Sequence, residues 1–586
     1  MALDFGGFRA GMTLEQGAQY SVLGGLLALL VVQLIAKFFS KPAISAKDRM
    51  MHELIDRMRG PGGFDYVIVC CSNLSGERYW QQRLEETIAL VTGHASKVLC
   101  VHEDWDGGAG NGLGTLYAIV KAIPLARAKH GVELLSELAA GRSVALYHTA
   151  GKGTRLAPLP AAENNNKPAV KLPELIDVGG EQRALTVLEA VIRQTSILGR
   201  RAAGRLAVFW GDQVFVPSTL AGVDSAPTHH ADILAALGPM PSATQWQARA
   251  LHQYGLIATD ACGDALQLEK VGYSDAVTLL PKDVRTVGTS LGSFSVSSGL
   301  LCELLKEFKP ELDKRVGQLD ADPHFWMPVT LSEAAYVRVM TSKGAAEPQA
   351  RSHWARMQGL KARVGKQMPE LRFFGAVPTG QEMHWWDYGR LELYKDNNVL
   401  ITDASPSARA LRHFLGATRR VQASQLGAVN VAPRACVLGC AFRGGHVGPR
   451  AVLVNVKAPY VDVDDCVLVN VSSLRPIIGR GGVLYNVVDE EVAGVLSCSE
   501  QAVRADVFVP ERAQLLPRLG SLAARHLAIH SAMDVDGGKA WKQRLPHNEL
   551  SFEEVHALNK DVDVIAAQEE AARLHARIAR MIFMPK

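Results

Sequence analysis

The sequence has little excess charge and no cysteine spacing typical of a metal site. Its formal net charge is +4 over 586 residues, spread along the chain, so a nucleic-acid-binding surface is not indicated. The nine cysteines lie mainly in apolar runs and lack the paired spacing of a zinc site, which predicts reduced core residues. No Gly-Lys-Ser/Thr stands where a Walker-type phosphate loop requires it. The chain is 48% hydrophobic and long enough to bury two substantial cores.

A glycine-rich stretch after a short apolar run is the most informative motif. The run 143–147 (SVALY) predicts a buried strand, and the stretch 149–156 (TAGKGTRL) follows it directly. Glycines at such a point let backbone N–H groups close around phosphate oxygens. Arg155 and Lys167 add fixed positive charge for a polyphosphate. The residues expected to line a nucleotide here are Gly151, Lys152, Gly153 and Thr154.

This stretch, followed by Lys167-Pro168, resembles the opening motif of the sugar nucleotidyltransferases. Three more motifs follow in the order of that family: 208–212 (VFWGD), 254–257 (YGLI) with Glu269-Lys270 after it, and 385–389 (WWDYG). The match covers roughly residues 143–400. Singly, each motif has a simpler interpretation, such as a capping aspartate in a turn or an ordinary surface ion pair. Their shared order favours the family.

The resemblance implies a role for each motif. In this family a sugar 1-phosphate oxygen attacks the α-phosphorus of a nucleoside triphosphate and pyrophosphate leaves, which requires positioning and charge neutralisation. Asp212 and Asp387 would hold a catalytic Mg²⁺, Arg155 would clamp the leaving phosphates, and Lys167 would meet the α-phosphate. The implied sugar-binding residues are Tyr254, Gly255, Glu269 and Lys270.

Two strand–helix units are predicted before the glycine-rich stretch, with strands at 64–71 and 96–102 and helices at 78–92 and 115–128. A second glycine-rich stretch, 107–115, follows the strand at 96–102 and leads into the helix at 115–128. It predicts either a cradle for a phosphate or nucleobase or a loop over the sheet edge. The nucleotide-binding residues expected there are Gly110, Asn111 and Gly112. This order resembles the GDP-fucose pyrophosphorylase branch, which favours GTP with fucose 1-phosphate, then UTP or GTP with a hexose 1-phosphate.

Residues 421–490 carry a local repeat at offsets of 15 to 16 residues, such as 452–456 (VLVNV) and 467–471 (VLVNV). Such offsets predict the rungs of a β-solenoid, preferably a left-handed β-helix, which could support a homo-oligomer. A helical tail is expected from 511 onward. The segment 319–328 (LDADPHFWMP) places two carboxylates and a histidine at alternate positions. These side chains could meet a metal or the sugar, although a packed loop with capping aspartates is the preferred interpretation.

The segment 20–39 is nearly long enough to span a bilayer, and basic residues follow it. We expect a membrane anchor with the catalytic domain facing the cytosol, in preference to an organelle-targeting presequence or a helix buried in a partner. The expected fold class is α/β: a Rossmann-like mixed-sheet nucleotidyltransferase domain, a C-terminal β-solenoid and an N-terminal membrane-anchor helix. The expected divisions of the chain are 1–50, 51–415, 420–510 and 511–586.

Two functions from different classes remain open. The first is a Mg²⁺-dependent sugar-1-phosphate nucleotidyltransferase, with a nucleoside triphosphate and a sugar 1-phosphate as partners. The second is a non-catalytic relative that serves as a regulatory or scaffolding subunit. The presence of Arg155, Lys167, Asp212 and Asp387 favours the first. Departures from the family pattern, including the longer loop at 164–166 (NNN), put the identity of the sugar in doubt more than the reaction.

Overall fold

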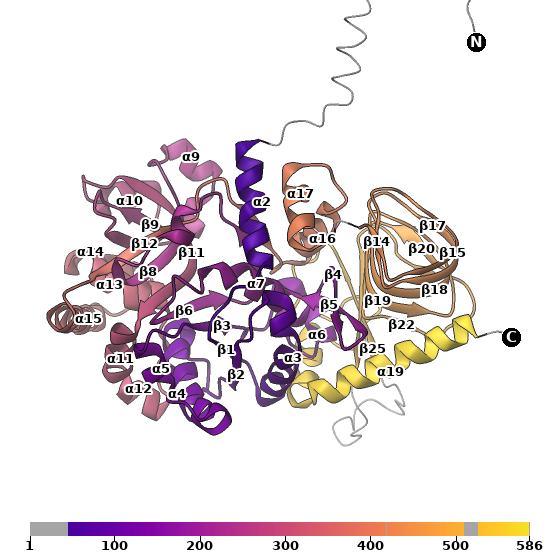
Figure 1. Ribbon diagram of the computed structural model, residues 1–586, viewed down its shortest axis with the longest axis horizontal. Helices are drawn as coiled ribbons and strands as arrows, with labels where there is room; N and C mark the ends of the chain where they lie inside the picture. Colours follow the sequence, from indigo (N-terminus) through magenta and orange to yellow (C-terminus); the bar gives the residue numbers. More distant parts are fainter. Residues whose placement is uncertain (1–44, 418, 509–525, 585–586) are drawn as a thin grey trace, which may run out of the picture. The chain divides into compact units, whose positions relative to one another are not determined.

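The computed structural model describes residues 45–417, 419–508 and 526–584. The chain divides into two compact units, 1–49 and 50–586. Only 45–49 of the first unit are described, and the sheets and helices of the second unit make up the fold (Figure 1). The finer boundaries expected within this unit stay predictions.

Among the described residues, nine strands form the first sheet, in the order β10-β9-β11-β6-β3-β1-β2, with β8 and β12 joined beside β11. Strands β2, β1, β3 and β6 are parallel, whereas β11 runs antiparallel to β6, β8 and β9. The bounds are β1 (Tyr66–Cys71), β2 (Lys97–His102), β3 (Val144–His148), β6 (Arg205–Trp210), β8 (His229–Gly238), β9 (Gly255–Thr259), β10 (Ala265–Glu269), β11 (Thr286–Ser297) and β12 (Arg372–Pro378).

The parallel strands are buried on both faces, as expected for short apolar runs covered by helices. Successive residues of β1 alternate between two cores: Val67 and Val69 pack with helices α3 and α7, and Ile68 packs with α4, α11 and α15. The predicted strands at 64–71 and 96–102 are confirmed as β1 and β2. The helix bounds are α3 (Leu74–Thr92), α4 (Gly110–His130), α7 (Val187–Thr195), α11 (Ser298–Glu307) and α15 (Glu347–Gln367).

Two short strand pairs flank the first sheet. A hairpin of β4 (Lys171–Val178) and β5 (Glu181–Thr186) follows the glycine-rich loop, and β7 (Gln213–Val216) pairs antiparallel with β13 (His384–Asp387). The second pair joins segments that are far apart in the sequence, and its register places Asp387 opposite Gln213. It therefore brings the predicted metal ligands Asp212 and Asp387 to one place.

The C-terminal strands form a second sheet, with twelve strands among the described residues. The repeat read from the sequence sets its register: Leu453 pairs with Leu468 and Leu468 with Leu484, in parallel. The bounds are β14 (Val421–Gln422), β15 (Gln425–Val431), β16 (Cys436–Leu438), β17 (Ala441–Val447), β18 (Val452–Asp464), β19 (Val467–Ser473), β20 (Ile477–Arg480), β21 (Val483–Tyr485), β22 (Val488–Asp489), β23 (Leu496–Ser497), β24 (Ala502–Phe508) and β25 (His526–Ala532).

The structure corrects the predicted fold class first in its C-terminal part. The C-terminal strands form one mainly parallel sheet that ends in the antiparallel pair β24–β25, and no closed solenoid is found among the described strands. The repeat determines which residues pair in neighbouring strands, but it does not specify closure into a coil. The architecture is accordingly a mixed α/β arrangement of parallel and antiparallel sheets.

The membrane-anchor prediction is also wrong on the structural evidence. Within 45–417, 419–508 and 526–584, no helix combines the length and apolar character needed to cross a bilayer. The long helices of this part carry charged residues along their length, as α19 (Val564–Phe583) does. The segment 20–39, on which the prediction depended, lies outside the described residues. The membrane-anchored location and the transmembrane description are therefore withdrawn.

The last described segment, 526–584, packs on the second sheet and also reaches the residues that follow the glycine-rich loop. Helix α19 buries Leu574 and Ile578 against Val488 and Phe508 (yellow in Figure 1). The preceding stretch, with β25 and α18 (Phe552–Leu558), forms a small core with Ala157, immediately after the glycine-rich loop. The tail is therefore part strand and part helix, and it reaches the site predicted from the sequence.

Candidate functional site

The predicted nucleotide loop and the first predicted metal ligand lie at one edge of the sheet. Strands β3 and β6 are parallel neighbours, and their last residues, His148 and Trp210, are paired. The loop follows β3 and Asp212 follows β6, at the carboxyl ends of the strands, where open α/β sheets bind ligands. Gly211 donates its N–H to the His148 carbonyl (3.0 Å), which ties the two connections together.

The glycine-rich loop is anchored at its ends and exposed in its middle. Thr149 donates both its N–H (3.0 Å) and its hydroxyl (2.8 Å) to the Cys70 carbonyl, and Leu156 is buried. Gly151 has φ +135° and Gly153 has φ +64°, conformations that favour glycine. Lys152 and Arg155 lie exposed beside them. In the part of the chain that the structure describes, Arg155 has no ion-pair partner, so its charge is available to a ligand.

Lys167 connects the loop to the aspartates. A Cβ on Gly153 would lie 3.2 Å from Cγ and Cδ of Lys167, so the lysine stem passes directly over the loop backbone. The Lys167 ammonium forms an ion pair with Asp212, and the two side chains are 15% and 24% exposed. A cation held beside the glycine-rich loop and a carboxylate can meet a bound phosphate.

Gly389 shows how closely the three charged groups converge. A Cβ on this residue would lie 2.9 Å from Oδ1 of Asp387, 3.4 Å from Oδ2 of Asp212 and 3.5 Å from Nζ of Lys167. The Asp387 carboxylate also accepts the Gly389 N–H at 2.7 Å, and Asn397 donates to the Asp387 carbonyl at 2.8 Å. The absence of a side chain at Gly389 therefore allows two carboxylates and a lysine to approach one another.

This arrangement fits a divalent cation. Mg²⁺ takes oxygen ligands and commonly binds through one or two carboxylates together with waters and substrate phosphates. Asp212 and Asp387 supply two carboxylates beside Gly389. Within the described ranges no group of three or more histidine, cysteine, aspartate or glutamate side chains could hold a metal by itself. Asp212 and Asp387 would therefore hold Mg²⁺ together with substrate oxygens.

The predicted sugar-binding residues lie together where β9 begins and β10 ends. Gly255 pairs with Glu269, and Lys270 contacts the Glu269 carboxylate at 3.2 Å. Tyr254, 40% exposed, lies with its ring centroid 6.3 Å from that of Trp385, two residues before Asp387. This aromatic contact joins the predicted sugar-binding residues to the segment that carries the predicted metal ligand Asp387.

The second glycine-rich stretch has a different environment. The Leu319 carbonyl accepts the N–H groups of Gly112 (2.8 Å) and Leu113 (3.1 Å), and Asp320 accepts that of Asn111 (3.0 Å). A Cβ on Gly110 would lie 2.7 Å from the Leu319 carbonyl oxygen. These donors at the start of α4 are thus bonded within the protein, and the glycines allow the close approach. Nucleotide binding by Gly110, Asn111 and Gly112 stays a prediction.

Some residues at the site were not selected from the sequence. In the tail, a Cβ on Gly537 would lie 2.2 Å from the Thr154 carbonyl oxygen, so the backbones touch. The Asn164 and Asn165 side chains donate to the carbonyls of Phe508 (3.1 Å) and His556 (2.8 Å). The long asparagine loop therefore attaches the C-terminal region to the site. The adjacent glycines at 537–538 were the available sequence signal of a close backbone approach.

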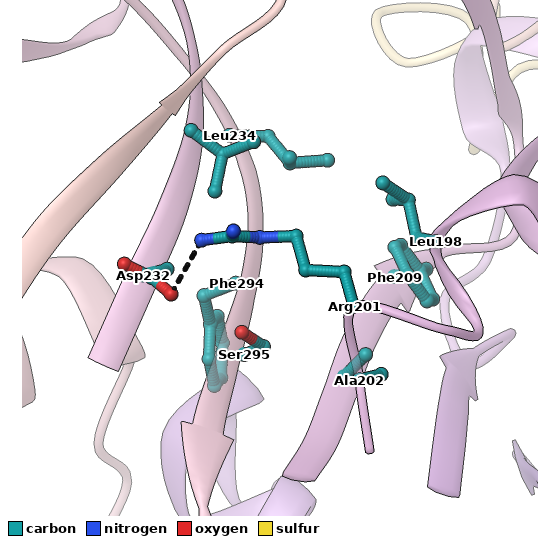
Figure 2. A pocket seen from close by; sticks show the side chains of 10 residues that line it. Leu198, Arg201, Ala202, Phe209, Asp232, Leu234, Phe294 and Ser295 are labelled. Carbon is teal, nitrogen blue, oxygen red and sulfur yellow. Dashed lines mark hydrogen bonds and ion pairs between the residues drawn. The ribbon is translucent and has the colours of Figure 1, made fainter. Parts of the chain in front are cut away.

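Two cavities of the molecule lie apart from the charged residues of the predicted site. One of about 30 Å³ is lined by Arg201, Asp232 and apolar side chains of β6, β8 and β11. Figure 2 shows the Arg201 guanidinium directed at Asp232, which it contacts at 2.8 Å. A second cavity, of about 660 Å³, lies between α3, the β4–β5 hairpin, the second sheet and α19. Neither is lined by Arg155, Lys167, Asp212 or Asp387.

Comparison with known proteins gives limited information. No family model matches the chain, and no curated protein matches it. Among solved structures, the chain is similar to the inositol-1-phosphate CTP transferase from T. maritima, a nucleotidyltransferase. The two are 10% identical with a TM-score of 0.20, and the alignment covers 61% of this chain and 99% of the other. A likeness at this level leaves the function to be argued from the site itself.

Proposed function

We propose that this chain is a Mg²⁺-dependent sugar-1-phosphate nucleotidyltransferase, which forms a nucleotide sugar and pyrophosphate. The observation that carries the proposal is the convergence of Lys167, Asp212 and Asp387 around Gly389, beside the glycine-rich loop. Three charged residues from distant parts of the sequence meet where two parallel strands end. A lysine and two carboxylates next to a phosphate-type loop suit phosphoryl chemistry.

Each charged residue has a role in this reaction. Arg155, exposed on the loop, would bind the β- and γ-phosphates that leave as pyrophosphate. Lys167 would contact the α-phosphate, where negative charge increases as the sugar phosphate oxygen attacks. Asp212 and Asp387 would hold Mg²⁺, which when bound neutralises phosphate charge and aligns the two reacting phosphates. The backbone N–H groups of 151–154 would line the nucleotide.

The sugar would bind along β9 and β10. Glu269 would accept hydrogen bonds from sugar hydroxyls, and Lys270 would meet the phosphate of the sugar. The Tyr254 ring, exposed beside Trp385, would place the sugar next to the metal ligands. GTP with fucose 1-phosphate is the first substrate pair to test, followed by UTP or GTP with a hexose 1-phosphate. Assembly into a homo-oligomer through the second sheet is a further part of the proposal.

The decisive experiment measures pyrophosphate release by the full chain with Mg²⁺. Four nucleoside triphosphates are combined with the 1-phosphates of fucose, glucose, mannose and galactose. Asp212→Asn and Asp387→Asn are compared with a matched control, Asp275→Asn, whose carboxylate forms an exposed ion pair with Arg338. We expect turnover with one preferred pair, lost in the first two variants and retained in the control.

Two other outcomes have clear meanings. Turnover that survives both site variants would remove the metal-binding role of the two aspartates. Nucleotide binding without turnover on any pair would contradict the proposed transferase activity and favour a non-catalytic regulatory or scaffolding subunit. Equilibrium binding of each nucleotide to the same protein separates this outcome from a misfolded preparation.

A further inference from the structure

Gly255 on β9 faces a compact group of polar side chains. A Cβ on this glycine would lie 2.7 Å from Oε2 of Glu269, 3.0 Å from Nε2 of Gln267 and 3.2 Å from Oδ2 of Asp322. Glu269 and Gln267 project from the same face of β10, and Asp322 begins the helical turn 322–326. Two carboxyl groups and an amide therefore surround a position without a side chain.

Two polar groups of this cluster lack a hydrogen-bond partner among the described residues. Gln267 is fully buried, and its Oε1 has no hydrogen-bond partner among the described residues. Within the same ranges, no protein donor reaches the half-buried Asp322 carboxyl. Burial, together with the charges of Glu269 and Asp320, raises the pKa of Asp322 to about 8, although Lys270 opposes the shift. A buried polar atom without a partner, such as Oε1 of Gln267, is costly, so a ligand that donates a hydrogen bond to it would be favoured.

The surrounding charges narrow the chemistry of that ligand. Lys270 contacts Glu269 at 3.2 Å, and Lys343 is close enough for both charges to affect its pKa, which burial lowers. A metal cation would be repelled by two lysines. A neutral, polyhydroxylated group instead supplies O–H donors to Gln267 and the carboxyls, and a phosphate on the same ligand suits the lysines.

Asp320, in contrast, has a structural role. Its Oδ1 accepts the Asn111 N–H at 3.0 Å, and the Asn111 side chain accepts the Ala321 N–H at 2.6 Å. Within 319–328, Asp320 is therefore the aspartate that caps a neighbouring backbone N–H group, as the preferred interpretation of this segment expects. These contacts also fix the backbone next to Asp322, and so they hold its carboxyl against Gly255.

We propose that Asp322 is a sugar-recognition residue, which binds a hydroxyl of the sugar 1-phosphate together with Glu269 and Gln267. The inference rests on the proposed function and adds to it the residue that selects the sugar. Asp322 comes from a segment outside the four motifs on which the transferase interpretation depends. The Tyr254–Trp385 contact links this group of side chains to the segment that carries Asp387.

The test compares Asp322→Asn, which preserves shape, with the control Asp275→Asn. In the full chain we expect the KM for the accepted sugar 1-phosphate to rise about 10- to 100-fold in Asp322→Asn, as expected when a buried hydroxyl of the ligand loses its hydrogen-bond partner. The KM for the nucleoside triphosphate should stay the same in all three proteins. Deoxy analogues of the sugar 1-phosphate, each lacking one hydroxyl, identify the hydroxyl that Asp322 binds. For one analogue, removal of the hydroxyl should raise the KM of the wild type and leave the KM of Asp322→Asn unchanged.

The outcomes separate this inference from the proposed function. Turnover with an equal sugar KM in the wild type and Asp322→Asn overturns the inference and leaves the transferase intact. If no substrate pair turns over, the proposed function fails, and thermal unfolding with 1-phosphates of fucose and glucose decides the inference. Stabilisation by a sugar phosphate but not by inorganic phosphate, lost in Asp322→Asn, supports sugar binding at Asp322. No stabilisation of the wild type overturns it.

Discussion

Gly389→Ala would place a single methyl group at the centre of the Lys167, Asp212 and Asp387 cluster. The new carbon would lie 2.9 Å from Oδ1 of Asp387, well inside ordinary van der Waals contact, and 3.4 Å from Oδ2 of Asp212. Gly389 is not among the residues with positive φ, so the backbone tolerates alanine and the effect is one of space. The Asp387 carboxylate must therefore move by a few tenths of an ångström.

The expected consequence is a large loss of turnover with a moderate loss of stability. Small displacements of catalytic groups can cost on the order of 100-fold in rate, so we expect kcat to fall about 10- to 100-fold. Overpacking at a buried site costs about 1–3 kcal/mol, which urea unfolding measures directly. The Mg²⁺ concentration at half-maximal activity should also rise, because one of the two carboxylates proposed to bind Mg²⁺ has moved.

Gly365→Ala is the matched control. A Cβ on Gly365, inside α15, has no neighbour within 4 Å, and alanine is the better helix former by about 1 kcal/mol. This variant should keep full activity and gain stability. If Gly389→Ala keeps the turnover and the Mg²⁺ dependence of Gly365→Ala, the cluster is not at the reacting centre, and the reasoning from convergence fails.

Three further predictions concern other parts of the site. Gly537→Ala places a Cβ 2.2 Å from the Thr154 carbonyl oxygen and should raise the KM for the nucleoside triphosphate. Gly538→Ala, whose Cβ lies 3.6 Å from the Thr154 hydroxyl, should leave this KM unchanged. Equal KM values in the two variants would exclude a role of the tail in nucleotide binding. The folded protein retains a proton on Asp322 from pH 3.8 to about 8, so stability falls as pH rises through this window. Asp322→Asn should then be more stable than the wild type by about 2–4 kcal/mol at pH 8, and hardly so at pH 4, by urea unfolding. Burial lowers the pKa of His148 to about 4, so its stabilising contribution is present above pH 6.5 and is lost as pH falls toward 4. Relative to His148→Gln, the wild type should lose about 2 kcal/mol between pH 7 and pH 5, and parallel curves would contradict a neutral buried imidazole.

The expectation of an α/β domain could be reached from the sequence because strand and motif signals are local. Short apolar runs such as 66–71 and 144–148 predict buried strands by composition alone. A glycine-rich loop after one strand and an aspartate after another can be recognised without knowing which strands are neighbours. The order of four motifs therefore sufficed to name Arg155, Lys167, Asp212 and Asp387.

Two predictions failed because local signals do not specify long-range arrangement. A repeat at 15 to 16 residues determines which residues pair across the second sheet, yet it leaves closure of the strands into a coil unspecified. An apolar run measures hydropathy and does not establish how a segment is used. No helix of the described residues is long and apolar enough to cross a bilayer.

The remaining features depend on contacts between residues far apart in the chain. Asp212 meets Asp387 because β7 pairs with β13, a strand much later in the sequence, and no local pattern encodes that pairing. The same holds for Asp322, which is one carboxylate in an alternating run until the fold places it against Gly255 and Glu269. The chemistry of each side chain can be read from the sequence. The residues that surround it, which determine its pKa and leave some of its hydrogen bonds unsatisfied, are determined by tertiary packing.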